Sequence, residues 1–225
     1  MDLYVRIDLL VLALPLALSF DRKVAFWRKW PQVFAAIAAV MAIFIPWDVW
    51  KTVRGVWGFN PEFAGRWRFF HLPPGEWLFF VCVPYACLFI LECVRAYFRG
   101  RAFAFGRAGV LAIAAGFAAA AWLLRAKLYT GTVVLSVGLA LAALEWIVPV
   151  TLRSRHFWTA LALTYLPFLI ANGALTALPV VWYDNARILG IRIGSIPVED
   201  FFYSFSMLAL AILAHDFVGQ RRRAP

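Results

Sequence analysis

Seven apolar runs, each of roughly 20 residues, fill most of this chain and leave few choices of fold. A helix needs about 20 residues to cross the ~30 Å hydrocarbon core of a bilayer. The runs lie near residues 3–20, 31–50, 76–98, 108–124, 128–149, 157–179 and 198–218. The segments between them are too short for a soluble domain. The sequence therefore predicts an all-α integral membrane protein with seven transmembrane helices.

Composition supports a bilayer as the solvent. Hydrophobic residues make up 64% of the 225 positions and charged residues 15%, and the mean hydropathy is +0.78, all outside the usual range of soluble domains. The first run is not read as a secretory signal, because Asp8 interrupts it and no small-x-small cleavage site precedes Asp21. The three cysteines fall in the third run, where thiols act as small apolar groups.

The distribution of basic residues predicts the orientation. With seven spans, nine of the 22 Lys and Arg residues fall on the side of the N-terminus and thirteen on the other, including Arg221, Arg222 and Arg223. The more basic side is expected to be cytoplasmic. We therefore expect a multi-pass inner-membrane protein with its N-terminus outside and its C-terminus in the cytoplasm. The net charge of +10 fits anionic lipid head groups, and no basic stripe interleaved with exposed aromatics indicates nucleic-acid binding.

The chain repeats itself at an offset of 124 residues. Without a gap, this offset pairs rare polar residues and prolines, which chance matching of apolar residues does not explain. The pairs include Asp48 with Asn172, Asn60 with Asp184, Arg68 with Arg192, Pro73 with Pro197 and Glu76 with Asp200. Residues 1–100 and 127–225 are thus predicted to be two three-helix repeats, joined by a connector helix in 101–126. Three helices and one connector helix return the chain to the side of the membrane where it began. The two repeats therefore run parallel and are related by a pseudo-twofold axis near the membrane normal.

Acidic residues follow a proline in both repeats, at the start of an apolar helix. Glu76 follows Pro73, and Glu199 and Asp200 follow Pro197. One interpretation is simple: acids at a helix start are favoured by the positive end of the helix dipole. The other is chemical, because matched acids surrounded by aromatic side chains are desolvated, which disfavours their charged form and suits them to proton donation.

Other intramembrane polar residues give weaker indications. Asp48 and Asn172 lie on the same side as the proline segments, so they either line a cavity or sit at the interface. Acids near the cytoplasmic helix ends are expected to pair with neighbouring arginines; these are Asp21, Glu92, Glu145 and Asp216. The histidines His71, His156 and His215 have no metal-ligand spacing, so no metal site is predicted.

Two stretches resemble the signatures of a known family. They are Leu72-Pro73-Pro74-Gly75-Glu76-Trp77-Leu78-Phe79-Phe80, followed by Val83-Pro84-Tyr85-Ala86-Cys87, and the run from Ile188 to Asp200. The chain is similar to the membrane-integral lycopene beta-cyclase family, in the fused form of the heterodimeric-type carotenoid cyclases. That family usually carries an acid pair after the proline in both halves, whereas Gly75 stands at the first acid position here.

The resemblance implies a cofactor-free carotenoid cyclase, an intramolecular lyase or isomerase. It would convert the linear psi-ends of lycopene to beta-ionone rings by acid-catalysed, non-redox carbocation cyclisation, giving gamma- and/or beta-carotene, with the carotenoid and membrane lipid as its partners. Glu199 is expected to donate the proton, and Asp200 and Glu76 are expected to set the proton inventory and act as base or hydrogen-bond partner. The residues expected to bind substrate are Asp48, Asn172, Pro73, Pro197, Trp77, Phe80, Phe201 and Phe202.

Rival classes lack their motifs. The only lysines are Lys23, Lys29, Lys51 and Lys127, so the seventh helix has none for a retinal Schiff base. No aspartate-rich motif for magnesium and diphosphate occurs, and no Gly-x-Gly-x-x-Gly run indicates a flavin. The alternative is a non-enzymatic carotenoid- or lipid-binding membrane protein, or a transporter subunit. Glu199→Gln separates the two, since only an enzyme would lose turnover.

Overall fold

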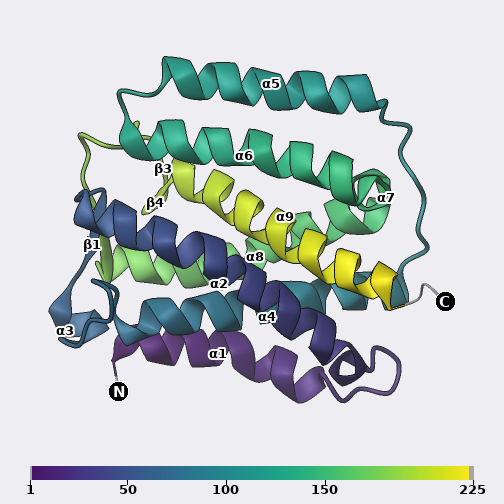
Figure 1. The fold of residues 1–225 in the computed structure, drawn as a ribbon. Coiled ribbons are helices and arrows are strands. Elements are labelled where there is room, and N and C mark those ends of the chain that lie inside the picture. The colour runs from purple at the N-terminus through teal and green to yellow at the C-terminus, as the bar shows by residue number, and fades with distance from the viewer. Residues whose placement is uncertain (1, 223–225) are drawn as a thin grey trace.

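The computed structural model describes residues 2–222, and each of the seven apolar runs forms a helix (Figure 1). The long helices are α1 (Leu3–Leu18), α2 (Trp30–Val53), α4 (Pro74–Tyr97), α5 (Arg107–Leu123), α6 (Leu128–Ile147), α8 (Arg155–Ala177) and α9 (Val198–Arg221). The short elements are η1 (Phe26–Lys29), α3 (Pro61–Ala64), α7 (Pro149–Arg153), β1 (Trp57–Phe59), β2 (Val181–Tyr183), β3 (Arg192–Ile193) and β4 (Ile196–Pro197). Arg223, counted above on the cytoplasmic side, lies outside the described residues.

Five of these helices are long and apolar enough to cross a membrane: η1 with α2, and α4, α6, α8 and α9. Helix α1 has 16 residues and α5 has 17, about 25 Å of helix each. Large apolar side chains on the outer helix faces are exposed, with Leu10 at 74%, Leu123 at 77% and Ile170 at 76%. Such a surface is stable in lipid and costly in water. The chain is therefore a membrane protein.

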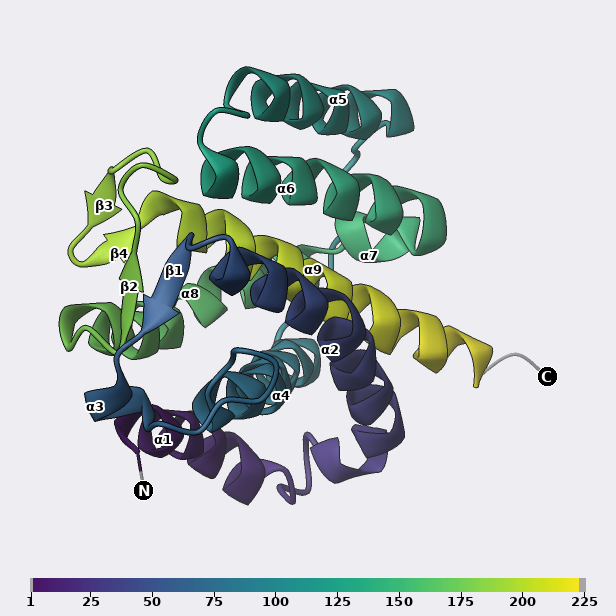
Figure 2. The ribbon, with the colours of Figure 1, turned by 60° about the vertical axis from the view of Figure 1, so that its left-hand side comes forward.

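The two repeats run in the same direction. Helices α1, α2 and α4 correspond to α6, α8 and α9, and α1 and α6 both start at the left of Figure 1. Within each repeat the first helix packs on the third, α1 on α4 and α6 on α9. Between repeats the packing is exchanged, because α2 packs on α9 while α8 packs on α4. This exchange is what a pseudo-twofold relation between parallel repeats produces. Helix α5 packs mainly on α6, at the outer edge (Figure 2).

A pair of short strands locates the pseudo-twofold axis. Strands β1 and β2 are antiparallel, with Gly58 opposite Trp182 at the centre of the pairing, and these two residues are 124 positions apart. The backbone hydrogen bonds outside the pair repeat the symmetry: Asn60 N–H donates to Val180 O at 3.0 Å, and Asp184 N–H to Val56 O at 2.9 Å. The axis thus passes between Gly58 and Trp182. Gly58 is needed there, since a Cβ would lie 2.3 Å from the Trp182 ring.

The strands were not predicted from the sequence, where their segments read as loops. Strands of two or three residues are too short for an alternating pattern to be detected.

At the other end of the helices, the charged pairs between acidic and basic side chains largely match the prediction from the sequence. Arg95 binds Asp216 through two hydrogen bonds of 2.7 and 2.8 Å and Glu92 at 2.9 Å, and Arg153 binds Glu145 at 2.8 Å. Asp21 instead accepts hydrogen bonds from the backbone of its own turn.

Candidate functional site

A cavity of about 620 Å³ lies between the two repeats, at the end where β1 and β2 meet. Most of its wall is apolar, but three acidic side chains reach it: Asp48 from α2, Glu76 from α4 and Asp200 from α9. All three are almost fully buried, between 1% and 7% exposed. We call it the acid cavity. Aromatic rings of Trp57, Phe59, Phe79, Tyr129, Tyr183 and Tyr203 share the wall.

Asp200 accepts three hydrogen bonds at this wall. The Tyr129 hydroxyl donates to Oδ1 at 2.7 Å, and the Tyr183 hydroxyl and Asn172 Nδ2 donate to Oδ2 at 2.8 Å each. Burial and the nearby Asp200 raise the pKa of Tyr183, in the β2 strand, well above its usual value of 10.0. Its hydroxyl therefore keeps its proton and remains a donor. Three donors converging on one carboxyl group favour its charged form over that of a carboxyl with fewer donors.

Glu76, the repeat mate of Asp200, has different neighbours. The Tyr4 hydroxyl donates to Glu76 Oε2 at 2.6 Å, and the Glu76 and Asp48 carboxyl groups are close enough to interact directly. Asp48 also accepts a hydrogen bond of 2.8 Å from the Tyr203 hydroxyl. Two neighbouring carboxyl groups in an apolar wall do not both ionise readily, so they share one proton. The first repeat therefore presents an acid pair where the second presents an acid and an amide, Asn172.

Glu199 does not line the acid cavity. Its side chain is fully buried, and Oε1 accepts hydrogen bonds from the Thr130 hydroxyl at 2.6 Å and the Leu189 N–H at 2.7 Å. Oε2 has no hydrogen-bond partner among the described residues. Adjacent helix residues diverge by about 100°, and it is Asp200 that reaches the cavity. The placement does not favour the sequence-based choice of Glu199 as proton donor, because its carboxyl group is tied to α6 and the loop before β3.

The structure explains why glycine occupies position 75. A Cβ on Gly75 would lie 2.5 to 2.8 Å from side-chain atoms of Tyr4, which is closer than van der Waals contact. Tyr4 needs this space to reach Glu76. In the first repeat the Tyr4 side chain therefore occupies the space beside Gly75, and its hydroxyl hydrogen-bonds Glu76. In the second repeat the corresponding donor is Tyr129, which is one position beyond the residue that the 124-residue offset pairs with Tyr4. Glu199, the repeat mate of Gly75, has room for its side chain there.

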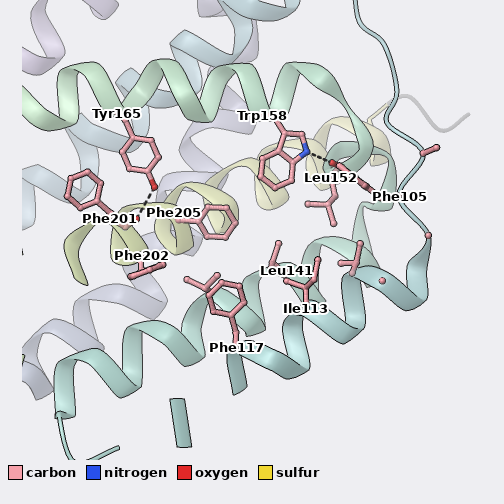
Figure 3. Close-up of a pocket in the computed structure, with 15 residues that line it drawn as sticks. Phe105, Ile113, Phe117, Leu141, Leu152, Trp158, Tyr165, Phe201, Phe202 and Phe205 are labelled. Atoms are coloured by element: carbon pink, nitrogen blue, oxygen red, sulfur yellow. Dashed lines mark hydrogen bonds between the residues drawn. The ribbon is translucent and has the colours of Figure 1, made fainter. Parts of the chain in front are cut away.

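A second cavity of about 520 Å³ lies between α5, α6, α8 and α9 (Figure 3). We call it the apolar cavity. Phe201 and Phe202, predicted to bind substrate, line this cavity together with Phe205 and not the acid cavity. The polar atoms at its wall are satisfied internally, since the Tyr165 hydroxyl donates to Phe201 O at 2.9 Å and Trp158 Nε1 donates to a backbone carbonyl, also at 2.9 Å.

The other predicted substrate-binding residues divide clearly. Asp48 and Asn172 line the acid cavity, whereas Pro73, Pro197, Trp77 and Phe80 line neither cavity. The prolines are the N-caps of α4 and α9. Phe80 is fully buried and packs on Phe44, and Trp77 donates to the Phe69 carbonyl at 3.3 Å. These four residues therefore lie outside both cavities.

Sequence reasoning missed the tyrosine hydroxyls that bind the acids. A detectable signal was present, because Tyr183 and Tyr203 stand opposite Phe59 and Phe79 in the repeat alignment. A tyrosine buried in an apolar segment usually has a partner for its hydroxyl group. Within residues 2–222, no group of three or more His, Cys, Asp and Glu side chains could hold a metal ion.

Comparison with known proteins identifies one matching family. A family model described as lycopene cyclase matches residues 2–94 and again residues 126–218. The two matches are offset by 124 residues, the offset read from the sequence, and they leave α5 outside both. Searches among curated proteins and among solved structures gave no match.

Proposed function

The chain belongs to the lycopene cyclase family, and we propose that it converts the linear psi-ends of lycopene to beta-ionone rings in the acid cavity. As a carotenoid cyclase it acts on a carotenoid substrate. The product proposed is gamma- and/or beta-carotene, formed by an intramolecular lyase reaction. The observation that carries the proposal is the contrast between two neighbouring acids, Asp48 and Glu76, and a triply hydrogen-bonded Asp200, at the wall of one apolar cavity.

The chemistry needs one proton to be given and one to be taken. Protonation of C2 breaks the C1=C2 double bond and leaves a cation at C1. The C5=C6 electrons then form the C1–C6 bond, which moves the positive charge to C5. Loss of the C6 proton regenerates the C5=C6 double bond and closes the β ring. No electrons leave the substrate, so substrate and product are isomers.

The two acid groups fit the two steps. The Asp48–Glu76 pair is assigned as the donor, because neighbouring carboxyl groups share a proton. Glu76 was expected from the sequence to be catalytic but as base or hydrogen-bond partner, and this proposal gives it the donor role instead of Glu199. Asp200 is assigned as the base, because its three hydrogen-bond donors favour the carboxylate. The faces of the aromatic residues around the acid cavity stabilise the transient cation, and the apolar wall keeps out water that would trap it. Asn172 holds Asp200 in place, and Glu199 anchors the start of α9.

The assignment is tested with purified protein in lipid vesicles, given lycopene in D2O without added cofactor. The wild type should form a cyclic product carrying one deuterium per ring, delivered at C2. Glu76→Gln removes one carboxyl group of the donor pair while keeping its shape, so turnover should fall by about 10²- to 10⁴-fold. Polyene binding, measured by the carotenoid absorption spectrum, should persist. A wild type that binds lycopene without converting it would instead indicate a carotenoid-binding protein.

A further inference from the structure

We propose that Lys51 is a positioning residue of the cyclase, whose buried ammonium charge holds Asp200 as the carboxylate that removes the proton. The inference rests on the proposed function and deepens it. Lys51 lies in the last turn of α2. It is the one lysine or arginine that is buried among the described residues, with 0% of its surface exposed.

Aromatic rings and one hydroxyl group surround the ammonium. Lys51 Nζ lies 4.4 Å from the ring centre of Tyr129, 4.7 Å from that of Trp47 and 5.6 Å from that of Trp57. It also donates a hydrogen bond to Thr132 Oγ1. Ring faces attract a cation within about 6 Å, so this box offsets part of the cost of burying the ammonium in an apolar bundle.

The box keeps the ammonium near the acids without pairing it to any of them. The acidic groups that interact electrostatically with Lys51 are Asp48, Asp200 and Glu199. No carboxylate lies within the 4.0 Å of a salt bridge to Lys51 in the described part of the chain. A direct ion pair would have occupied an oxygen of one acid. The ammonium instead contributes a field, and the oxygens of Asp48 and Asp200 remain available to tyrosines, Asn172 and substrate.

Tyr129 links the ammonium to the base physically. One face of its ring packs against Lys51, and its hydroxyl donates to Asp200 at 2.7 Å. A cation over a phenol ring draws electron density from the hydroxyl group and makes it a stronger donor. Both the field and this hydrogen bond therefore favour the ionised form of Asp200.

The cation is present on one side of the pseudo-twofold axis alone. The repeat mate of Lys51 is Leu175, and the mate of Thr132 is Asp8. Fold symmetry therefore does not require Lys51, and the two repeats differ in charge where their acids differ in role. The titratable groups around the box are Asp48 on α2, Tyr129 on α6, Tyr183 on β2, and Glu199, Asp200 and Tyr203 on α9.

The test is the pH profile of lycopene cyclisation by the full-length protein in vesicles. Lys51→Met keeps the length and apolar stem but removes the charge. Without the cation every nearby carboxyl group is harder to ionise, so both limbs of the profile should move to higher pH, by about one unit. Lys51→Arg keeps the charge and should keep the wild-type position of the profile. Lys127→Met is the matched control. Lys127 lies at the same end of the helix bundle and donates to the backbone oxygen of Asn185, so its loss should leave the pH profile unchanged.

The outcomes separate the inference from the function. A residue needed only for packing would change the melting temperature and expression but not the pH profile, so an active Lys51→Met protein with an unshifted profile overturns the inference alone. If Lys51→Met does not accumulate, Thr132→Val removes the hydrogen-bond acceptor of the ammonium and must move the profile in the same direction. An unshifted profile for that variant also overturns the inference. A wild type without cyclase activity at any pH overturns the proposed function instead.

Discussion

Replacing Asp200 by asparagine tests the proposed base against a neighbour of the same chemistry. Asp200→Asn keeps the size of the side chain but puts an NH2 group where donors converge. Whichever way the amide is turned, it faces the Tyr129 hydroxyl or both Tyr183 and Asn172, the donors seen at 2.7 to 2.8 Å. One unpaired buried donor costs about 1–3 kcal/mol of stability. Loss of the base should lower turnover by about 10²- to 10⁴-fold.

Glu199→Gln is the matched control at the adjacent position. The amide oxygen can keep both hydrogen bonds that Oε1 accepts, from Thr130 and Leu189, and the NH2 group replaces Oε2, which has no partner among the described residues. We expect turnover within a few-fold of wild type. The assay is initial rate of lycopene loss per correctly folded molecule in vesicles. Near-normal turnover of Asp200→Asn with an inactive Glu199→Gln would refute this assignment and restore Glu199 as the donor expected from the sequence.

Two further variants test the supporting structure. Gly75→Ala should displace Tyr4, whose side chain lies 2.5 Å from the new Cβ. The free energy of unfolding should fall by about 1–3 kcal/mol, and most of the turnover should be lost. A wild-type melting temperature and wild-type activity would show that Tyr4 does not need this space. Arg95→Met leaves Asp216 without its two hydrogen bonds from arginine and should cost about 3 kcal/mol in unfolding free energy. Turnover per folded molecule should stay near wild type, because Asp216 lies about 24 Å along α9 from Asp200; a selective loss of turnover with normal stability would contradict that separation.

Much of the fold could be predicted because the bilayer restricts what an apolar chain can form. Each apolar run became a helix, and the 124-residue offset matches both the family segments and the β1–β2 register. Rare residues such as Asp48 and Asn172 carried that signal, since the apolar background repeats by chance. The short strands β1 and β2 escaped prediction because their pairing depends on the symmetry of the assembled repeats, which no local pattern encodes.

The site was predicted in part. Glu76 and Asp200 were chosen together with Asp48 and Asn172, and all four line the acid cavity. Choosing between Asp200 and Glu199 required the helix rotation, which the sequence leaves undetermined when both neighbours are acidic and both are buried.

The hydrogen-bond donors and the cation were missed for a different reason. Tyr4, Tyr129 and Lys51 come from helices far apart in sequence from the acids they serve. Their importance lies in contacts made after folding, and each resembles an ordinary interfacial residue when read locally.

The most direct test of the account is expression of the chain in a bacterium that accumulates lycopene, followed by chromatography and mass measurement of the pigments. The account predicts that lycopene is replaced by gamma- and/or beta-carotene of the same mass, and that Asp200→Asn cells with equal protein in the membrane retain lycopene. Unchanged lycopene in cells whose membranes contain the folded wild-type protein, or a product of altered mass, would contradict proton-driven cyclisation in the acid cavity.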